Sequence, residues 1–277
     1  MEEIAYAKIN LALHVRARTP DGYHDIETLF AFADDGDRLS AEPSEALTLA
    51  VRGPFAAGLD DADDNLVLRA ARMLRERRAV RDGVALTLDK RLPVASGIGG
   101  GSADAAAALR LLARLWGLDP TDPVFMEIAA QLGADIPACL ASETARGEGR
   151  GDALTPIDAF DLAGTPLLLV NPGVPLATGA VFGAWDGIDR GALPEGAPLP
   201  AALAGRNDLE APACMHAPAI RALLTRLSAQ PGVLLARMSG SGATCFALFS
   251  SAAERDAAHA AIASGEPGWW CFPARIR

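Results

Sequence analysis

Hydrophobic and polar positions alternate along residues 4–15, which is the pattern of a half-buried strand. Lys8 and Asn10 stand two positions apart in this segment, so both side chains are expected on the same face. The Thr-Pro-Asp-Gly turn at residues 19–22 precedes a second extended apolar segment at residues 28–33. The pattern therefore predicts a β-hairpin at the start of the chain.

Apolar residues with helical spacing predict helices at residues 66–81, 102–116, 123–132, 218–229 and 252–263. Short apolar or alternating runs predict strands at residues 84–88, 165–170, 233–238 and 245–250. The Gly- and Pro-rich segment 183–205 is expected to be mostly loop. Helices and strands alternate throughout, which is typical of an α/β or α+β protein, and a length of 277 residues favours two domains.

The composition excludes several classes of protein. The apolar runs are shorter than the ~18 residues that a membrane-spanning helix needs, and the acidic N-terminus does not resemble a secretory signal. We therefore expect a soluble, cytoplasmic protein. A net charge of −10 disfavours a nucleic-acid partner, which would attract a basic surface. The four cysteines lack metal-ligand or disulfide spacing, so we expect reduced and mostly buried thiols.

Lysine is almost absent from the chain. Of the 25 basic residues only Lys8 and Lys90 are lysine, and the others are arginine. An ammonium group acts as a compact point charge, which a planar guanidinium does not replace at a reacting phosphate. Both lysines are therefore candidates for a functional role.

Residues 97–104 read Gly-Ile-Gly-Gly-Gly-Ser-Ala-Asp and lead directly into a predicted helix. Glycines let backbone N–H groups approach an anion closely, and the start of the helix adds unpaired donors and its dipole. The stretch therefore predicts a phosphate site, although it fits neither a Walker loop nor a dinucleotide fingerprint. The alternative is a flexible loop whose helix is capped by Ser102.

A second cluster of small residues, Ser-Gly-Ser-Gly-Ala at residues 239–243, lies between two predicted strands. A tight turn and a functional loop explain this cluster equally well. Together, the two clusters suggest that two loops of small residues face one ligand.

Three motifs in order resemble the superfamily of galactokinase, homoserine kinase, mevalonate kinase and phosphomevalonate kinase (GHMP kinases). They are Ala-Tyr-Ala-Lys-Ile-Asn-Leu at residues 5–11, the glycine-rich stretch at residues 92–104, and Met-Ser-Gly-Ser-Gly-Ala at residues 238–243. The resemblance implies an α+β fold of two domains, residues 1–160 and residues 161–277. The first would be like domain 2 of ribosomal protein S5 and would bind ATP, and the second would be ferredoxin-like.

Shorter motifs are similar to one branch of this superfamily, the 4-diphosphocytidyl-2-C-methyl-D-erythritol kinases. They are Asp-Gly-Tyr-His at 21–24, Glu-Thr-Leu-Phe at 27–30, Asp-Asn-Leu-Val at 64–67 and Gly-Ala-Asp-Ile-Pro at 133–137. The resemblance implies an enzyme that transfers a phosphoryl group from ATP to the 2-hydroxyl of a cytidine diphosphate-linked small molecule. We expect this enzyme to be a monomer or a homodimer. The alternatives are phosphorylation of homoserine, mevalonate or a sugar, and a non-catalytic ligand sensor.

The resemblance assigns the catalytic roles to Asp135 and Lys8. Asp135 would be the general base on the substrate hydroxyl, and Lys8 would stabilise the developing alkoxide and the transferring phosphoryl group. The alternatives are a carboxylate at a helix end for Asp135 and an ordinary cation at a strand end for Lys8.

The resemblance also implies two groups of binding residues. ATP would contact Pro93, Val94, Ala95, Ser96, Gly97, Ile98, Gly99, Gly100, Gly101, Ser102 and Ala103, with Asn65 and Lys90 near its adenine and ribose. The substrate would contact Asn10, Tyr23, His24, Thr178, Phe182, Gly240, Ser241 and Gly242, with the Tyr23 ring stacked on the cytosine and His24 bonded to its edge.

Each of these assignments has a structural alternative. Asn65 could simply cap a helix, Lys90 could be a solvated cation, and Tyr23 could close the hairpin. Asp104 would repel a nucleotide if it faced one, so it is expected to point away and stabilise the start of its helix. Mg²⁺ is expected with ATP, but the sequence shows no acidic pair that identifies its ligands.

Overall fold

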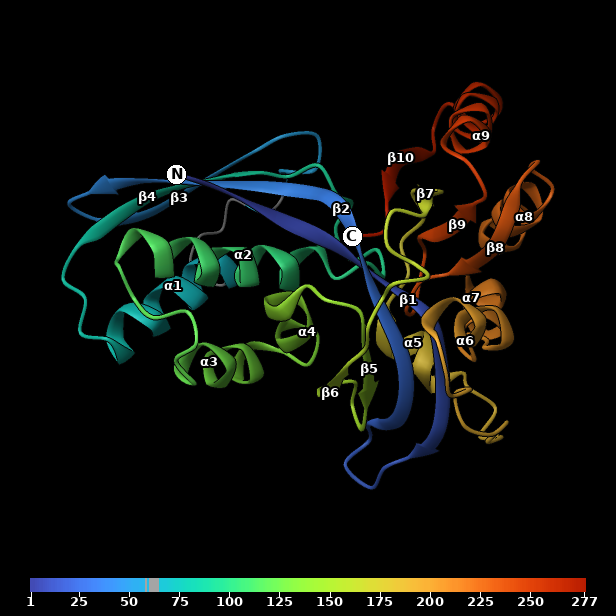
Figure 1. Cartoon of the computed structure of the whole chain (residues 1–277), viewed down its shortest axis with the longest axis horizontal. Coiled ribbons are helices and arrows are strands. Elements are labelled where there is room, and N and C mark those ends of the chain that lie inside the picture. Colours follow the sequence, from blue (N-terminus) through green and yellow to red (C-terminus); the bar gives the residue numbers. More distant parts are fainter. Residues whose placement is uncertain (58, 60–64) are drawn as a thin grey trace. The chain divides into compact units, whose positions relative to one another are not determined.

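The computed structural model describes residues 1–57, 59 and 65–277 (Figure 1). The chain divides into two compact units, each built from segments that are distant in sequence. Unit 1 consists of Met1–Ala7, Asp35–Val94 and Gly99–Ser142, and unit 2 of Lys8–Asp34, Ala95–Ile98 and Glu143–Arg277. The predicted domains are continuous stretches of the chain that meet between residues 160 and 161, and this boundary stays a prediction.

The predicted N-terminal hairpin is confirmed. β1 (Glu2–Arg18) pairs with β2 (His24–Ser44), and both strands contribute to both units. The turn between them closes when the Thr19 N–H donates to the Tyr23 carbonyl at 2.9 Å. Gly22 has a φ of +87°, a left-handed conformation that favours glycine. Both strands are longer than the apolar pattern indicated, because their outer ends carry polar residues.

Unit 1 contains a sheet with helices packed together beside it (Figure 1). β2 pairs antiparallel with β4 (Gly83–Asp89), and β4 pairs parallel with β3 (Leu47–Arg52), which the apolar pattern did not predict. The helices are α1 (Leu66–Arg77), α2 (Gly100–Leu115), α3 (Val124–Leu132) and α4 (Ile136–Ala141). Helix α2 is buried along most of its length and contacts α1 and α4, so it forms the centre of this unit.

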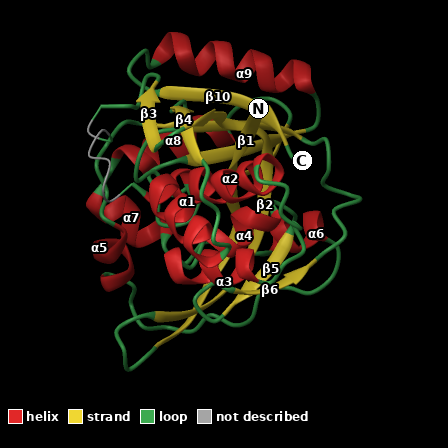
Figure 2. Ribbon diagram, turned by 90° about the vertical axis from the view of Figure 1, so that its left-hand side faces the viewer, coloured by secondary structure: helices red, strands yellow, loops and turns green. Residues whose placement is uncertain are grey.

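Unit 2 contains the pairing of β2 with β5 (Ala145–Glu148) and of β5 with β6 (Ala153–Pro156). It also contains a separate antiparallel sheet in the order β10 (Trp270–Arg275), β7 (Pro166–Asn171), β9 (Cys245–Phe249) and β8 (Val233–Met238). Its helices are α5 (Thr178–Gly183), α6 (Pro198–Ala204), α7 (Glu210–His216), α8 (Ala219–Ser228) and α9 (Ala252–Gly265). Figure 2 shows α9 lying along β10, which it contacts.

Most predicted elements are confirmed within a few residues, and the mixture of helices with largely antiparallel sheets is α+β. Three expectations need correction. The helix predicted to end at residue 81 ends at Arg77, the helix predicted from residue 102 begins at Gly100, and the expected loop 183–205 contains α6. The pattern did not predict the short elements α4, α5, α7, β5 and β6, or the strand β10.

The four thiols are free, and three of them are buried, as expected. Within the described ranges, no helix is long and apolar enough to cross a membrane.

Candidate functional site

The glycine-rich stretch leads into α2 through a left-handed residue. Gly99 has a φ of 64° and occupies the N-cap position, and the Ala103 N–H donates to its carbonyl at 2.7 Å. No side chain caps this helix, so the alternative of a helix capped by Ser102 is wrong, and Ser102 lies within the first turn. Helix starts without a capping side chain leave backbone donors available to an anion. This part of the stretch can therefore bind a phosphate.

The segment Ala95–Ile98 packs against the second cluster of small residues within unit 2. Ser239 Oγ donates to the Gly97 carbonyl at 2.9 Å, and the Thr244 N–H donates to the Ser96 carbonyl at 3.0 Å. A Cβ on Gly97 would lie 2.5 Å from the Ser239 carbonyl oxygen, so only glycine permits this approach. The two clusters therefore contact each other, and the suggestion that both face one ligand stays a prediction.

Hydrogen bonds from other segments also hold the second cluster in place. Asn207 Nδ2 donates to the Met238 and Gly240 carbonyls, both at 2.8 Å. A Cβ on Gly240 would approach the Gly97 carbonyl to 2.9 Å, which explains a glycine here. Thr178 Oγ1 and Ser241 Oγ are 3.0 Å apart and connect the cluster to α5. The cluster is therefore more than an isolated tight turn.

Lys8 and Asn10 lie side by side on β1, as their spacing predicted. Lys8 Nζ donates to Asn10 Oδ1 at 3.0 Å, and Asn10 Nδ2 donates to Thr28 Oγ1 at 2.7 Å. The Asn10 N–H donates to Ser239 Oγ, which ties β1 to both small-residue loops. Lys8 is only 3% exposed and lies 5.1 Å from the centre of the Phe30 ring. Lys8 is therefore a buried ammonium in the interior of β1, and the alternative of an ordinary cation at a strand end is wrong.

Asp135 is the N-cap residue of α4 in unit 1, yet its side chain makes no capping hydrogen bond. Pro137 occupies the second helical position and has no N–H to donate to a capping carboxylate. The Asp135 carbonyl accepts from the Cys139 N–H at 3.1 Å, so the helix uses the backbone of Asp135 and not its carboxylate. The carboxylate therefore has no capping role at this helix end.

His24 begins β2 and lies among aromatic side chains of unit 2. Its ring centre is 5.0 Å from that of Phe182 and 5.7 Å from that of Trp185, which it meets edge to face. Burial, followed by the nearby Arg18 guanidinium, lowers the pKa of His24 below its ordinary value. A neutral imidazole is an acceptor at one nitrogen and a donor at the other, and can therefore bind the edge of a base.

Tyr23 precedes this cluster, and its side chain is 57% exposed. The Arg150 guanidinium lies 5.2 Å from the centre of its ring. The Tyr23 backbone carbonyl closes the hairpin turn, so the turn does not need the Tyr23 ring. Its exposed face is suited to stacking.

Asn65 and Lys90 both have structural roles in unit 1. Asn65 Oδ1 accepts from the Val67 N–H at 2.9 Å and caps α1. Lys90 is 2% exposed and donates to Asp37 at 2.5 Å and to Asp104 at 2.6 Å. The alternative of a solvated cation at Lys90 is wrong. The carboxyl group of Asp104 is buried against Lys90, and the expectation that Asp104 points away from the nucleotide and stabilises the helix start stays a prediction. Asp64 lies outside the described residues.

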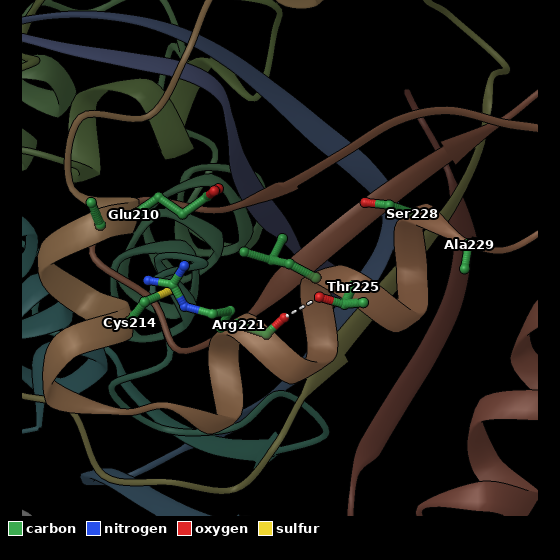
Figure 3. A pocket seen from close by; sticks show the side chains of 8 residues that line it. Glu210, Cys214, Arg221, Thr225, Ser228 and Ala229 are labelled. Carbon is green, nitrogen blue, oxygen red and sulfur yellow. Dashed lines mark hydrogen bonds between the residues drawn. The ribbon is translucent and has the colours of Figure 1, made fainter.

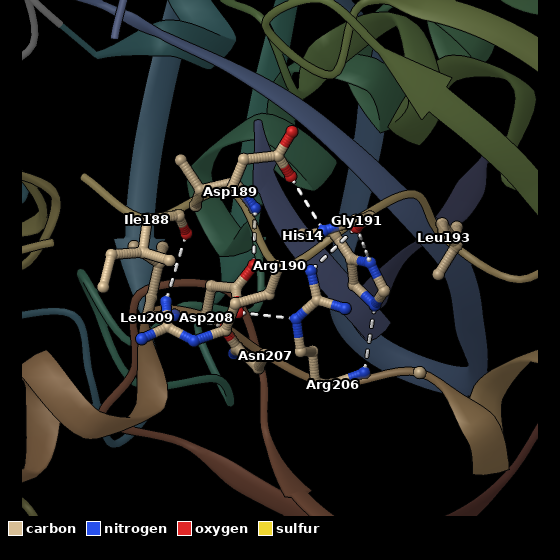
Figure 4. A network of polar contacts seen from close by, with 12 residues as sticks. His14, Ile188, Asp189, Arg190, Gly191, Leu193, Arg206, Asn207, Asp208 and Leu209 are labelled. Carbon is tan, nitrogen blue, oxygen red and sulfur yellow. Dashed lines mark hydrogen bonds and ion pairs between the residues drawn. The ribbon is translucent and has the colours of Figure 1, made fainter. Parts of the chain in front are cut away.

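His14, on β1, organises a polar network that fixes the segment before α6 (Figure 4). Its Nε2 accepts from the Arg206 N–H, and its Nδ1 lies 3.1 Å from the Gly191 carbonyl, to which it donates. Arg206 in turn donates to Asp208 at 2.7 Å. Burial lowers the pKa of His14, and Arg206 adds to that effect.

A surface pocket of about 610 Å³ lies between α7 and α8 (Figure 3). Its lining includes Glu210, Cys214, Arg221 and Thr225, and none of the predicted site residues. Across the ranges that the structure describes, no group of three or more His, Cys, Asp or Glu residues is placed to hold a metal ion.

Sequence reasoning missed several supporting residues. These residues are Asp37, Arg18, Trp185, Thr28 and Asn207, and each contacts a predicted residue or loop. Thr28 lies within the quoted motif at residues 27–30, but the motif did not indicate its contact with Asn10. Asp104 also carried a local signal, because it lies just after the glycines.

Comparison with known proteins identifies the family. The model described as GHMP kinases N terminal domain matches residues 65–143, and the one described as GHMP kinases C terminal matches residues 197–266. A 4-diphosphocytidyl-2-C-methyl-D-erythritol kinase from Rhizorhabdus wittichii is 61% identical over 277 residues, covering 99% of this chain and 94% of the relative. One of the same name from Novosphingobium aromaticivorans is 54% identical, covering 100% of this chain and 93% of the relative.

Solved structures agree with the sequence relatives. A crystal structure of 4-(cytidine 5'-diphospho)-2C-methyl-D-erythritol kinase matches with a TM-score of 0.82 and 33% identity, covering 100% of this chain and 99% of that one. A crystal structure of L. major mevalonate kinase in complex with R-mevalonate shares the fold at a TM-score of 0.71 and 18% identity, covering 100% of this chain and 96% of that one. The chain belongs to the 4-diphosphocytidyl-2-C-methyl-D-erythritol kinase family of the GHMP kinases.

Proposed function

We propose that this protein transfers the γ-phosphoryl group of ATP to the 2-hydroxyl of 4-diphosphocytidyl-2-C-methyl-D-erythritol. The observation that carries the proposal is the glycine-rich stretch, which enters α2 through left-handed Gly99 without a capping side chain. Full-length relatives at 61% and 54% identity that bear this kinase name support the choice of substrate.

Asp135 is proposed as the general base. Its carboxylate takes the proton of the 2-hydroxyl, the oxygen attacks the γ-phosphorus, and the bond to the bridging oxygen of ADP breaks. Its place in the Gly-Ala-Asp-Ile-Pro motif at residues 133–137, which is similar to that of these kinases, supports the role. Lys8 is proposed to stabilise the charge on the attacking oxygen and the transferring group, and its hydrogen bond to Asn10 supports a fixed position for its ammonium.

The cytosine is proposed to bind at His24. Tyr23 and Phe182 would cover its faces, because one ring is exposed and the other packs against His24. The neutral state of His24 supports hydrogen bonding to the base edge. Asn10, Thr178, Gly240, Ser241 and Gly242 are proposed to contact the remainder of the substrate.

Mg²⁺ is proposed to enter as part of the Mg·ATP substrate, held mainly by phosphate oxygens. The described residues offer no acidic cluster for it, so we assign no protein ligand. A cytoplasmic location, a monomeric or homodimeric state and the lack of a nucleic-acid partner stay predictions from the sequence.

The direct test mixes the purified protein with Mg·ATP and 4-diphosphocytidyl-2-C-methyl-D-erythritol and follows the reaction by ³¹P NMR. We expect a new phosphomonoester signal and stoichiometric ADP. Parallel reactions contain homoserine, mevalonate or galactose. Phosphorylation of one of these compounds, with none of the cytidine diphosphate-linked compound, would refute the proposed substrate.

A further inference from the structure

A buried ion-pair cluster lies next to the glycine-rich stretch in unit 1. Lys90 follows β4, Asp37 lies on β2 and Asp104 lies in the first turns of α2. Lys90 Nζ donates to Asp37 Oδ2 at 2.5 Å and to Asp104 Oδ2 at 2.6 Å. All three side chains are at most 5% exposed. We call this cluster the Asp37–Lys90–Asp104 triad.

The triad contacts both ends of the glycine-rich stretch. At the entry, Asp37 Oδ1 accepts from the N–H groups of Arg91 and Leu92, at 2.5 and 2.8 Å. At the exit, Asp104 follows Ala103 directly and binds Lys90. The two ends of the stretch are therefore connected through the Lys90 ammonium group and through Asp37 on β2.

The triad also lies directly against the backbone of the first turn of α2. A Cβ on Gly100 would be 3.1 Å from Lys90 Nζ and 3.9 Å from Asp37 Oδ2. Lys90 Nζ donates to two carboxyl groups and lies against the first turn of α2, so we infer that Lys90 stabilises the start of this helix. Any displacement of Lys90 would move the N–H groups that Gly100 and its neighbours present to an anion.

The two carboxyl groups are not equivalent. Asp37 accepts three hydrogen bonds through its two oxygens. Asp104 Oδ1 is buried, and no described residue hydrogen-bonds to it. Burial, together with the nearby Asp37 carboxylate and against the effect of Lys90, raises the pKa of Asp104 to about 8.

We propose that the Asp37–Lys90–Asp104 triad is a positioning device for the phosphate-binding stretch. Its support of ATP binding is expected to be strongest while Asp104 is protonated. In this role Lys90 acts through Asp104 and the helix start. An ionised Asp104 adds a buried negative charge beneath the site of the phosphates, which weakens binding of a polyanion. The proposal rests on the proposed use of ATP, and it is independent of which alcohol is phosphorylated.

The test measures the Kd of Mg·ATP by titration calorimetry for the full chain and three variants. Asp104→Ala removes the bond to Lys90, and Asp104→Asn keeps an acceptor for Lys90 but cannot ionise. Glu3→Gln is the matched control, since Glu3 pairs with Arg110 and Arg114 of the same helix, outside the glycine-rich stretch and its first turn. At neutral pH we expect Asp104→Ala to raise the Kd roughly tenfold, and Asp104→Asn and Glu3→Gln to change it less than about threefold.

The steady-state constants separate positioning from a general loss of structure. In the positioning role, Asp104→Ala raises the KM for ATP while the KM for the second substrate stays near that of the wild type. A Kd and KM for ATP equal to the wild-type values in folded Asp104→Ala would overturn the proposal. Wild-type protein that does not bind Mg·ATP at all would instead overturn the proposed function.

A pH series on Asp104→Asn decides the question even if Asp104→Ala does not fold. Lys90 and Asp37 are the charged groups that shift the pKa of Asp104. The buried residues of helices α1 and α3 are apolar, and the buried titratable group of α4 is the Cys139 thiol. Between about pH 7 and about pH 9.5 the wild-type Kd for Mg·ATP is expected to rise relative to that of Asp104→Asn. Ionisation of ATP affects both proteins equally, so parallel curves would overturn the proposal.

Discussion

Replacement of Asp135 by asparagine separates catalysis from stability. The helix α4 uses the backbone carbonyl of Asp135, and Pro137 removes a donor that a capping carboxylate would accept from. Asparagine keeps the shape of the side chain, so we expect the free energy of unfolding to change by less than about 1 kcal/mol. Loss of a general base lowers kcat about 10²- to 10⁴-fold, which corresponds to about 3 to 5 kcal/mol in activation free energy.

The assay couples ADP formation to NADH oxidation, and urea unfolding of the same preparation gives the stability. Binding of Mg·ATP should stay within about threefold of the wild-type Kd, because the general base acts on the alcohol. Glu127→Gln is a suitable control for the loss of a carboxylate. Glu127 lies on neighbouring α3, and its carboxylate forms an exposed ion pair with Arg77. A kcat of Asp135→Asn close to that of the wild type would refute the assignment of the base.

Three further predictions concern structural residues. Asn65→Ala removes the cap of α1 and should lower the free energy of unfolding by about 1 kcal/mol in urea melts, whereas Asn65→Asp should retain most of it. Arg237 is buried and donates to the carbonyls of Leu11, Ala202 and Gly205, so Arg237→Met should cost about 3 kcal/mol in the same assay, and an unchanged midpoint would contradict this. Because the pKa of His14 is lowered in the folded state, the unfolded chain binds a proton more readily, and stability should fall as the pH drops below about 6.5; melting temperatures of His14→Gln should fall less over that range.

Local patterns were sufficient for many elements. Alternation predicted β1 and the beginning of β2, and the run of alanines and leucines predicted α2, because strand and helix periodicity appears in neighbouring residues. Edge strand β3 and the short helices α4 and α7 escaped prediction, since a few residues carry too weak a periodic signal. Both α2 and α1 also showed end points that differ from the apolar pattern, because helix ends depend on caps and left-handed residues.

The candidate site divides in the same way. The glycine-rich stretch, Lys8 and Asn10 on one strand face, and the family resemblance all came from short contiguous motifs. The contact between Gly97 and Ser239 joins residues 142 positions apart, and it was only suggested by the two glycine clusters. The packing of His24 against Trp185, and the tie between Asn10 and Thr28, had no signal in the sequence.

The sequence by itself predicted a phosphate-binding stretch and showed that the chain has only two lysines. Only the tertiary structure decided what each lysine does. Lys8 lies buried beside Asn10, whereas Lys90 is enclosed by two carboxyl groups from β2 and α2. The physical reason is that burial and charge pairing depend on segments brought together by folding: Asp37 is 53 positions from Lys90, and no local pattern records that distance.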